Sequence, residues 1–438
     1  MKKIALILCV VFFIASCEKD VDSLPVEEIL EDLICEGCGI EIVKDLSRIT
    51  QYNQTVNISS RGSNKKTLAA SKVNSISLKL KGTVDPLYID YNGGQVLLNA
   101  NHVDVNSKRV AASYSLHGEP YSGAVDILSV KKGEIVNLEG TLILPGRDID
   151  AVSFLNSNNI FLGGGFDARE YFGGDYPSFI ARYKIQYNKK TDVLSLREDE
   201  LFHSLFGNKL RSLKTQNGIV SGSGGGNSGV IFAFDEKKNK LILNNSNETE
   251  GLFILDTSIE KNGNNYDFIA LAFNNDTKEL KAFYYDISKS TDKMNFSYEV
   301  SLGTFNVNVE AKHSIAVPKK GWLAVSLGKE GLGLFKINTD DGVKTASLEQ
   351  QIKSEILNPA LPNEVVNSFV FKSDICWIAA GEAGLYIIPY STKNNKFDDS
   401  YRHVSFGNQI SVNSVGKSDN DLVVATTEGV SIFSISGL

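Results

Sequence analysis

Short stretches in which apolar and polar residues alternate recur from about residue 73 to residue 438, separated by turns rich in Gly, Asn, Asp and Lys. An alternation with period two is typical of β-strands that bury one face. Long stretches with helical periodicity are missing from this part of the sequence. The pattern therefore predicts an all-β protein built from many short strands.

The strands form a repeat in which a buried strand, a tight turn ending in Gly and a second strand follow one another. Three copies show it most clearly, at 322–335, 375–388 and 422–433. Gly suits the turn because it adopts a positive φ without a Cβ clash. Four weaker copies lie upstream, at 95–130, 160–187, 219–235 and 268–288. The turns recur about every 45 to 55 residues, the length of a four-stranded blade, so seven copies predict a seven-bladed β-propeller.

The two ends of the repeat region complement each other. The last copy ends directly after its third strand, and an orphan strand with apolar residues at Ile76, Leu78 and Leu80 precedes the first copy. A propeller pairs its first and last blades so that no sheet edge is left open. We therefore expect residues 73–438 to form one ring, closed by an N-terminal strand at 73–82.

The strand 385–390 follows Gly381 and Gly384 and resembles the strand of LVIVD-like propeller repeats from bacterial surface proteins. The sequence departs from that pattern at Pro389 and Lys336, which stand where the repeats have an aspartate. The resemblance implies a propeller in a bacterial envelope. It implies no particular activity, because the family has no single function.

The first seventeen residues have the features of an export signal. Lys2 and Lys3 precede an apolar run at 4–14, which is too short to span a bilayer as a permanent helix. The residues Ile-Ala-Ser-Cys at 14–17 resemble a bacterial lipobox. The resemblance implies a signal peptide at 1–16, lipidation of Cys17 and attachment to a membrane by acyl chains. An ordinary secretory signal is the alternative.

Residues 17–72 are predicted to be a tether. The segment Glu-Lys-Asp-Val-Asp at 18–22 resembles the export tags of surface lipoproteins in the Bacteroidetes, which implies the outer membrane and the cell surface. A solvated spacer is the alternative interpretation of this short segment. Residues 51–71 are rich in Asn, Ser, Thr and Lys, and such a composition buries too little apolar surface to offset ordering.

The cysteines fit an exported protein. Cys35 and Cys38 form a close pair, for which a disulfide is the leading prediction outside the cytosol. Free thiols, or a redox or metal pair, are the alternatives, and no histidine or further cysteine follows closely to complete a metal site. Cys376 lies in an apolar strand and is expected to be an inert core thiol.

Composition and charge exclude several classes of partner and cofactor. The chain has 45 Lys and Arg against 52 Asp and Glu, and it becomes more acidic when Lys2 and Lys3 leave with the signal. An acidic protein is not expected to bind nucleic acid. The segment 224–229 fits G-x-G-x-x-G, but an apolar strand at 230–234 follows where a dinucleotide site needs a helix. We therefore expect no cofactor and no metal.

The insertion in the second copy is the candidate ligand-binding site. It combines aromatic and charged residues between two glycine clusters, at 163–165 and 173–174. Long loops on a rigid scaffold often carry function, and aromatic rings with carboxylates and Arg suit a sugar or a protein partner. The alternative is that these rings pack the loop onto the propeller. The candidate residues are Phe166, Asp167, Arg169, Glu170, Tyr171, Phe172 and Tyr176.

These observations predict an envelope-anchored lipoprotein whose propeller is a non-enzymatic scaffold and binds a glycan or protein partner through loops on one face. The alternative is a polysaccharide-active enzyme, a hydrolase or lyase, that uses carboxylates on that face, with Asp167, Glu170, Asp175 and Glu119 as candidates. A metal-dependent hydrolase would need several of the five scattered histidines to converge. Those histidines are His102, His117, His203, His313 and His403.

Overall fold

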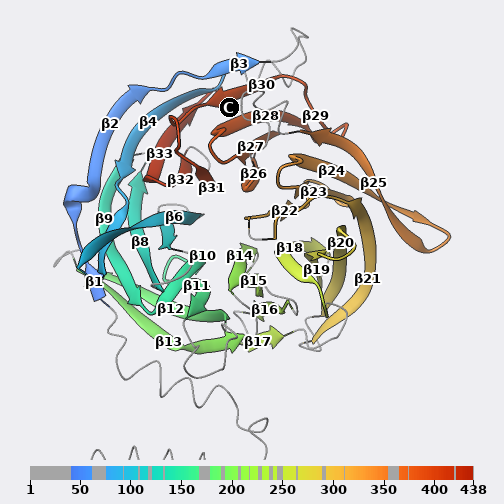
Figure 1. Ribbon diagram of the computed structural model, residues 1–438, viewed down its shortest axis with the longest axis horizontal. Helices are drawn as coiled ribbons and strands as arrows, with labels where there is room; N and C mark the ends of the chain where they lie inside the picture. The colour runs from blue at the N-terminus through green and yellow to red at the C-terminus, as the bar shows by residue number, and fades with distance from the viewer. Residues whose placement is uncertain are drawn as a thin grey trace, which may run out of the picture. The chain divides into compact units, whose positions relative to one another are not determined.

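The computed structural model shows a ring of antiparallel sheets within the unit 40–438 (Figure 1). It describes residues 41–61 and 75–437, apart from 92, 107–108, 117–120, 132–133, 167–177, 189–192, 206–208, 217, 225–228, 236–239, 244–249, 263–264, 289–292, 310, 354–364, 373 and 419–420. Seven sheets lie side by side around a central axis, so the all-β, seven-bladed propeller predicted from the repeat is confirmed.

Each blade has one innermost strand next to the axis and three further strands toward the rim. The innermost strands of blades 1 to 7 are β6 (Gly94–Asn106), β10 (Arg147–Asn156), β14 (Leu210–Gln216), β18 (Phe253–Asn262), β22 (Ile315–Ala316), β26 (Ser368–Lys372) and β31 (Val412–Lys417). The second strands are β7 (Arg109–Ser115), β11 (Asn159–Phe166), β15 (Ile219–Gly224), β19 (Asn265–Asn274), β23 (Trp322–Ser326), β27 (Ile375–Ala379) and β32 (Asp421–Thr426).

The third and fourth strands complete the blades in the same order. The third strands are β8 (Ser122–Lys131), β12 (Ser178–Asn188), β16 (Ile231–Asp235), β20 (Glu279–Ser288), β24 (Leu332–Asp340), β28 (Leu385–Ser391) and β33 (Gly429–Ser436). The outer strands are β9 (Glu134–Pro145), β13 (Val193–Leu205), β17 (Lys240–Leu243), β21 (Lys293–Thr304), β25 (Val343–Ile352), β30 (Tyr401–Val404) and β4 (Ser77–Val84). Two short strands extend blades 1 and 6: β5 (Leu87–Tyr91) pairs with β6, and β29 (Lys396–Phe397) pairs with β28.

Six of the seven predicted copies of the repeat correspond to the second and third strands of one blade, and the copy at 95–130 also contains β6, the innermost strand of blade 1. The turns between these strands require Gly in several blades. Gly331 has a φ of 95° and Gly429 a φ of 98°, and a Cβ at either position would collide with the carbonyl oxygen of a neighbouring strand. The strands on both sides of such a turn are buried, as in β32, where all described residues are buried. Gly is therefore needed where the chain reverses inside the packed ring.

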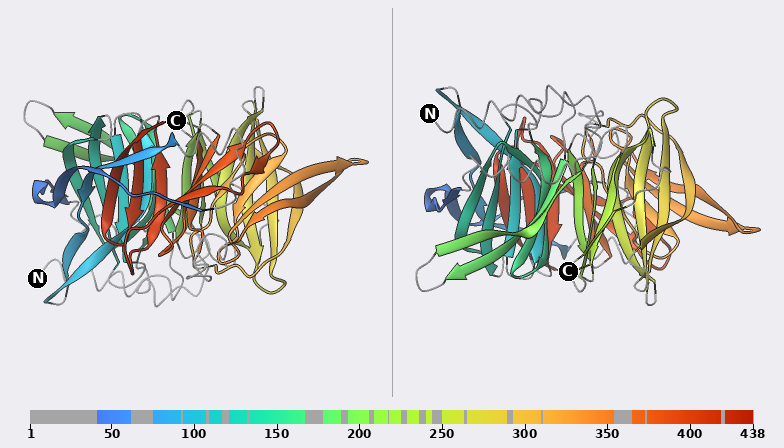
Figure 2. Two further views of the ribbon diagram at one scale, coloured as in Figure 1. Left: turned by 90° about the horizontal axis from the view of Figure 1, so that it is seen from above. Right: turned by 90° about the horizontal axis from the view of Figure 1, so that it is seen from below.

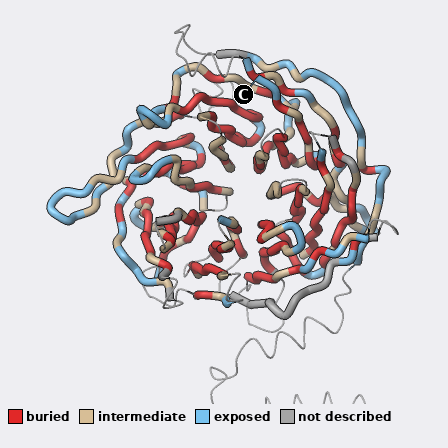
Figure 3. Tube along the Cα trace, turned by 180° about the vertical axis from the view of Figure 1, so that it is seen from behind, coloured by how far each residue is buried: buried red, intermediate tan, exposed pale blue. Residues whose placement is uncertain are grey.

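The hydrophobic core lies between neighbouring blades. One cluster joins blades 6 and 7 through Trp377 and Val424, and another joins blades 4 and 5 through Phe273 and Phe335. Figure 3 shows buried residues concentrated in the inner strands and exposed residues on the rim. Figure 2 shows the strands crossing the thickness of the disc and the β24–β25 hairpin extending beyond the rim. Because each blade is covered on both faces, its middle strands are apolar on both sides.

The predicted closing strand is present. β4 pairs antiparallel with β33, with Ser77 opposite Ser436 and Val84 opposite Val430, and so supplies the fourth strand of blade 7. The observed strand begins and ends a few residues later than the predicted 73–82. Its pairing hides the edge that the C-terminal strand would otherwise leave open.

The tether expected at 17–72 differs from the structure over residues 41–61. There β1 (Glu41–Val43) pairs with β9, β2 (Ile49–Thr55) pairs with β4, and β3 (Ser59–Arg61) pairs with β30. These strands form an outer layer around blades 1, 7 and 6 (Figure 1). β2 is almost entirely exposed, so backbone pairing holds it and no apolar pattern marks it in the sequence.

One buried side chain fixes this outer layer. Arg48, at the end of the 3₁₀ turn η2 (Leu46–Arg48), donates to both carboxylate oxygens of Asp126 at 3.0 and 2.9 Å and to the main-chain oxygen of Asp85. Tyr114 and Thr141 also donate to Asp126, at 2.6 and 2.5 Å. The buried charges are thus paired and hydrogen-bonded, which is the condition for burying an ion pair without a large penalty.

Candidate functional site

Most of the site residues predicted from the sequence lie outside the described residues. These are Cys17, Cys35 and Cys38, and, in the insertion, Asp167, Arg169, Glu170, Tyr171, Phe172 and Tyr176. Phe166 ends β11, but its side chain is not described, and Ser178 begins β12. The insertion therefore joins the second and third strands of blade 2, as predicted, and its role stays a prediction.

The structure places Tyr114, from the first copy of the repeat, in a strand of blade 1 and away from any candidate site. Tyr114 lies in β7, is fully buried and donates to Asp126. Burial raises its pKa well above the usual value for a tyrosine. It is therefore a packing residue in blade 1. Cys376 is buried and free, and burial raises the pKa of its thiol, so the predicted inert core cysteine is confirmed.

The described histidines His102, His313 and His403 make separate contacts. His403 stacks on Tyr386 in blade 6, where its Nε2 lies 2.6 Å from the main-chain oxygen of Ala383. His102 and His313 lie near the axis. Within the described part of the chain, His, Cys, Asp and Glu form no group of three that could hold a metal ion.

The innermost strands present unpaired backbone groups toward the axis, because each is the edge of its sheet. Polar side chains of the neighbouring blade bond many of them. Asp104 in blade 1 accepts from the Phe154 N–H of blade 2 at 2.7 Å, and Ser368 in blade 6 accepts from the Val415 N–H of blade 7 at 3.1 Å. Ser153 and Thr215 join blades 2 and 3 at 2.7 Å. These polar residues hold neighbouring blades together around the axis.

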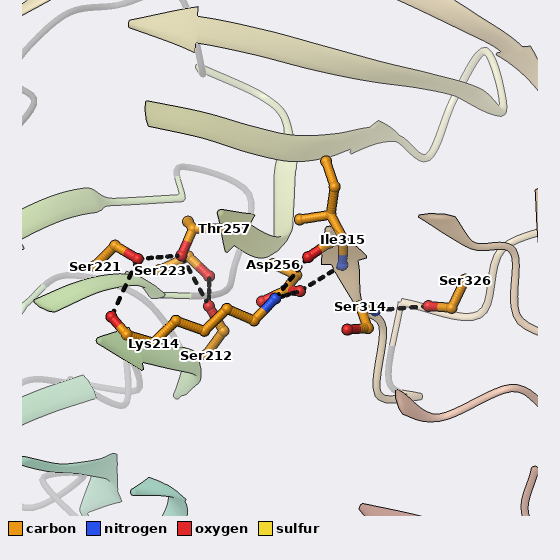
Figure 4. Close-up of polar contacts among 9 residues, drawn as sticks. All are labelled: Ser212, Lys214, Ser221, Ser223, Asp256, Thr257, Ser314, Ile315 and Ser326. Atoms are coloured by element: carbon orange, nitrogen blue, oxygen red, sulfur yellow. Dashed lines mark hydrogen bonds and ion pairs between the residues drawn. The ribbon is translucent and has the colours of Figure 1, made fainter. Parts of the chain in front are cut away.

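Blades 3, 4 and 5 are joined by the network in Figure 4. Lys214 extends from β14 and donates to the carboxylate of Asp256 in β18 and to the main-chain oxygen of Ile315, the latter at 2.8 Å. The Ile315 N–H donates to the same carboxylate at 2.6 Å. Asp256 is 1% exposed, so these two donors stabilise its buried carboxylate.

Two cavities follow each other along the innermost strands, and we call them the lower and the upper cavity. The lower cavity has a volume of about 310 Å³ and is lined by residues of all seven blades. One representative from each blade, in order, is His102, Ser153, Lys214, Ser258, Ser314, Ser368 and Ser414. Most of these residues take part in the contacts between blades, so few of their polar groups are left to meet a ligand.

The upper cavity is larger, about 590 Å³, and opens where the turns between second and third strands emerge, since Glu382 and Thr427 from two such turns line it. It too is lined by all seven blades. One residue from each, in order, is Asn101, Asp150, Arg211, Leu255, Lys312, Asn367 and Asn413. The ends of β11 and β12, which the insertion joins, belong to the same face of the ring by topology.

A segment between β21 and β22, residues 305–314 without residue 310, brings Lys312 to the upper cavity. The ammonium group of Lys312 donates to the main-chain oxygen of Asn101, so it reaches from blade 5 to blade 1. The guanidinium group of Arg211, from blade 3, donates to the main-chain oxygen of Val309 in this segment. His313 holds the segment in place, with Nε2 2.8 Å from the oxygen of Asn308.

Burial changes the charge state of groups near the axis. It lowers the pKa of Lys312 to about 7, an effect that Asp150 opposes and Lys209 strengthens. It also lowers the pKa of His102 to about 3, with the charges of Lys312 and Lys214 acting in the same direction. A neutral His102 agrees with its Nδ1 accepting from the Val152 N–H at 3.3 Å. Burial near the axis therefore favours the neutral form of both Lys312 and His102.

The sequence prediction missed the residues of this cavity. A weak signal was present, because polar residues stand in or shortly before the first strand of several blades, as Lys209, Lys312, Asn367 and Asn413 do. The sequence prediction chose the aromatic insertion, whereas the described cavity is lined by residues of the innermost strands and of the segments and turns beside them. No aromatic residue is among the described residues that line the upper cavity.

The fold and the axial cavities define a seven-bladed β-propeller of the kind that serves as a binding scaffold. No protein-family model matches the chain, and no curated protein does. Among solved structures, the WD40 β-propeller domain of Doa1 is similar over 80% of this chain and 96% of that chain, with 15% identity and a TM-score of 0.48. The computationally designed Ika8 protein covers 88% of this chain and 100% of its own, with 14% identity and a TM-score of 0.40. The fold assignment rests on the seven sheets themselves.

Proposed function

We propose that this protein is a lipid-anchored binding protein of the bacterial cell envelope and that it holds the end of a glycan in its upper cavity. The observation that supports the proposal is a cavity of about 590 Å³ on the axis, lined by residues of all seven blades and by polar residues of every blade except blade 4. Sites for small molecules have volumes of about 300–1,000 Å³. Carboxamide groups both donate and accept, and carboxylates accept, so together they suit sugar hydroxyls.

The anchor part of the proposal is supported by the lipobox-like sequence at 14–17 alone. In the part of the chain that the structure describes, no helix is long and apolar enough to cross a membrane. Cys17→Ala is expected to release the protein from the membrane fraction or to block its processing. Digestion of intact cells with protease then distinguishes the cell surface from the periplasm, because only a surface protein is cut. A Cys17→Ala protein that stays in the membrane fraction would contradict the lipid anchor.

The glycan part is tested with the full-length, detergent-solubilised protein on an array of bacterial and host oligosaccharides. Ala311 lines the upper cavity, so Ala311→Trp should fill it and abolish binding while the melting temperature stays the same. Val343→Trp is the matched control, because Val343 is 62% exposed on the β24–β25 hairpin. Binding that survives Ala311→Trp would place the ligand elsewhere. Capture of a protein with no glycan bound would favour the protein-partner alternative.

The aromatic residues of the blade 2 insertion are candidate ligand contacts on the basis of the sequence. Replacing Tyr171 and Phe172 by Ala is expected to weaken glycan binding, because each aromatic ring stacked on a sugar contributes about 0.5–1.5 kcal/mol. A large fall in melting temperature would instead identify the rings as packing residues.

The enzymatic alternative makes a different prediction for the same cavity. Asp150 and Glu382 are carboxylates from blades 2 and 6 that line it, and glycoside hydrolysis uses two carboxyl groups about 5–10 Å apart. Incubation of the bound oligosaccharide with the protein would then release shorter products. An unchanged oligosaccharide supports binding without cleavage.

A further inference from the structure

We propose that Lys312 is a nucleophilic amine that binds a small hydroxylated aldehyde in the upper cavity as an imine. The proposal goes beyond the proposed function, because holding the end of a glycan requires no covalent bond. The open-chain form of a reducing sugar is one aldehyde of this class. Three features of Lys312 support the proposal: its place on the axis, its hydrogen bonding and its enclosure by the ring.

Lys312 places its amine at the level where the two cavities meet. The side chain comes from blade 5 and donates to the main-chain oxygen of Asn101 in blade 1, and these two blades are not neighbours in the ring. Lys312 and Asn101 line the upper cavity, whereas His102, the next residue, lines the lower one. The amine therefore lies at the inner end of the upper cavity, whose volume of about 590 Å³ is sufficient for a small molecule.

The hydrogen bonding of Lys312 leaves its nitrogen able to react. The acceptor at Asn101 is an uncharged carbonyl oxygen, and Lys312 forms no ion pair with a carboxylate in the part of the chain that the structure describes. Lys214 differs, because the carboxylate of Asp256 pairs with it. A neutral amine keeps the bond to Asn101 through one N–H and still has its lone pair. A lysine lone pair is the nucleophile that attacks a carbonyl carbon.

Enclosure by the ring favours the neutral amine. Burial lowers the pKa of Lys312 to about 7, Asp150 opposes this shift and Lys209 strengthens it. About half of the amine is then neutral at pH 7, against fewer than about one in a thousand for an ordinary exposed lysine. The side chain is still partly accessible, so a solute in the cavity reaches it. The charged and titratable residues that line the upper cavity with Lys312 are Asp150, Lys209, Arg211, His313 and Glu382, and those that line the lower cavity are His102, Asp104, Lys214 and Lys417.

Imine formation needs the amine and the aldehyde alone. The nitrogen lone pair attacks the carbonyl carbon, and a C–N bond forms. The carbonyl oxygen then receives the two protons of the neutral amine and leaves as water, so that a C=N bond remains. Asp150 lines the same cavity, and its carboxylate is suited to relay these protons. Carboxamide groups such as those of Asn99 and Asn367 also line it and suit hydroxyl groups, which favours a hydroxylated aldehyde over an apolar one.

The first test captures the imine on the full-length, detergent-solubilised protein. Glyceraldehyde is added at pH 7 with sodium cyanoborohydride, which reduces an imine to a stable secondary amine, and peptide mass spectrometry measures the modified fraction of each lysine. Lys319 is the internal reference, because it is exposed and lies before β23. We expect Lys312 to be modified at least about tenfold faster than Lys319. With butanal, which has no hydroxyl group, the ratio of the two rates should be smaller.

A second test measures the amine itself. Trace labelling with acetic anhydride follows the neutral form of each lysine as the pH changes. Between pH 7 and pH 9 the rate at Lys312 should rise only about twofold, because half of the amine is already neutral, whereas an ordinary exposed lysine should rise about a hundredfold. A merely structural role of Lys312 does not predict this flat profile.

The cavity variants show whether the aldehyde arrives through the upper cavity. Ala311→Trp fills that cavity and should slow the capture of glyceraldehyde at Lys312, while the rate at Lys319 stays the same. Val343→Trp is again the matched control, because Val343 is exposed on the β24–β25 hairpin, and it should change neither rate.

Each contrary outcome overturns a stated part of the proposal. Capture at Lys312 no faster than at Lys319 would overturn the imine site. A larger ratio with butanal than with glyceraldehyde would overturn the hydroxylated class of aldehyde. Unchanged capture in Ala311→Trp would overturn the place of the site in the upper cavity. None of these tests uses a glycan, so a failure here is distinct from a failure of the proposed function on the oligosaccharide array.

Discussion

The two cavities on the axis are made by the same innermost strands but use their polar residues differently. In the lower part, Asp104 and Ser368 bond the backbone of the next blade. In the upper part, Lys312 and Arg211 donate to main-chain oxygens, and both residues line the cavity. Asn413 and Ser414 are neighbours in the sequence, yet they line the upper and the lower cavity respectively.

The comparison shows how a ring can be stable and still offer a site. Backbone groups at the edge of each sheet must be bonded, and the lower level meets much of this need. Asn367 and Asn413 also bond main-chain oxygens of the next blade, at 2.9 Å each, so the upper level contributes to closure as well. Lys312 and Arg211 likewise bond main-chain oxygens of other parts of the ring, but both residues also line the upper cavity. Substitutions at the two levels should therefore affect different properties.

The largest effect is expected from Asp256→Ala in the lower level. The substitution leaves Lys214 without its carboxylate and removes the acceptor of the buried Ile315 N–H, so the free energy of unfolding should fall by about 3 kcal/mol. Urea denaturation measures the loss. Asp276→Ala, in an exposed turn, is the control and should change little. A loss below about 1 kcal/mol would show that the network in Figure 4 does not hold blades 3 to 5 together.

A smaller loss is expected from Ser326→Ala. The Ser326 hydroxyl accepts from the Ser314 N–H at 2.6 Å, and both residues are buried. Removing the acceptor leaves a buried N–H without a hydrogen bond, which lowers the free energy of unfolding by about 1–3 kcal/mol. Ser405→Ala, at an exposed position, controls for the loss of a hydroxyl. Urea denaturation again measures the loss. Identical unfolding curves for the wild type and Ser326→Ala would contradict a stabilising role of this hydrogen bond.

At the upper level, Lys312→Met should change how stability depends on pH. The pKa of Lys312 is about 7 in the folded protein and 10.5 ordinarily. Between these values the unfolded chain binds more protons, so wild-type stability should rise with pH, whereas the variant lacks this rise. The free energy of unfolding of the variant should therefore exceed that of the wild type most at pH 7 and below. Urea midpoints at pH 6, 8 and 10 measure the difference, and a difference independent of pH would contradict the burial of this amine.

The smallest effect is expected from Glu382→Gln. Glu382 is an exposed residue on the rim of the upper cavity, so the free energy of unfolding should stay within about 0.5 kcal/mol of the wild type. Thermal denaturation measures it. A clear loss of stability would mean that the rim also serves to hold the ring, and the contrast between the levels would weaken.

The sequence indicated the fold because the repeat is local. Alternating strands and turn glycines such as Gly331 and Gly429 depend on neighbouring residues, and the orphan strand before the first copy had a clear apolar pattern. The outer strands at 41–61 were missed because an exposed edge strand such as β2 pairs through its backbone and needs no apolar face. Arg48 was missed for a related reason, since its partner Asp126 is distant in the sequence.

The sequence by itself determined the strand pattern, the number of blades, the closing strand and the core position of Cys376. Only the tertiary structure decided which residues meet at the axis. Asn101, Arg211, Lys312 and Asn413 come from four blades and line one cavity. Their proximity depends on how the blades close around the axis. A pattern with period two predicts the face of the strand on which a residue lies, but it does not predict which distant strand the residue will approach.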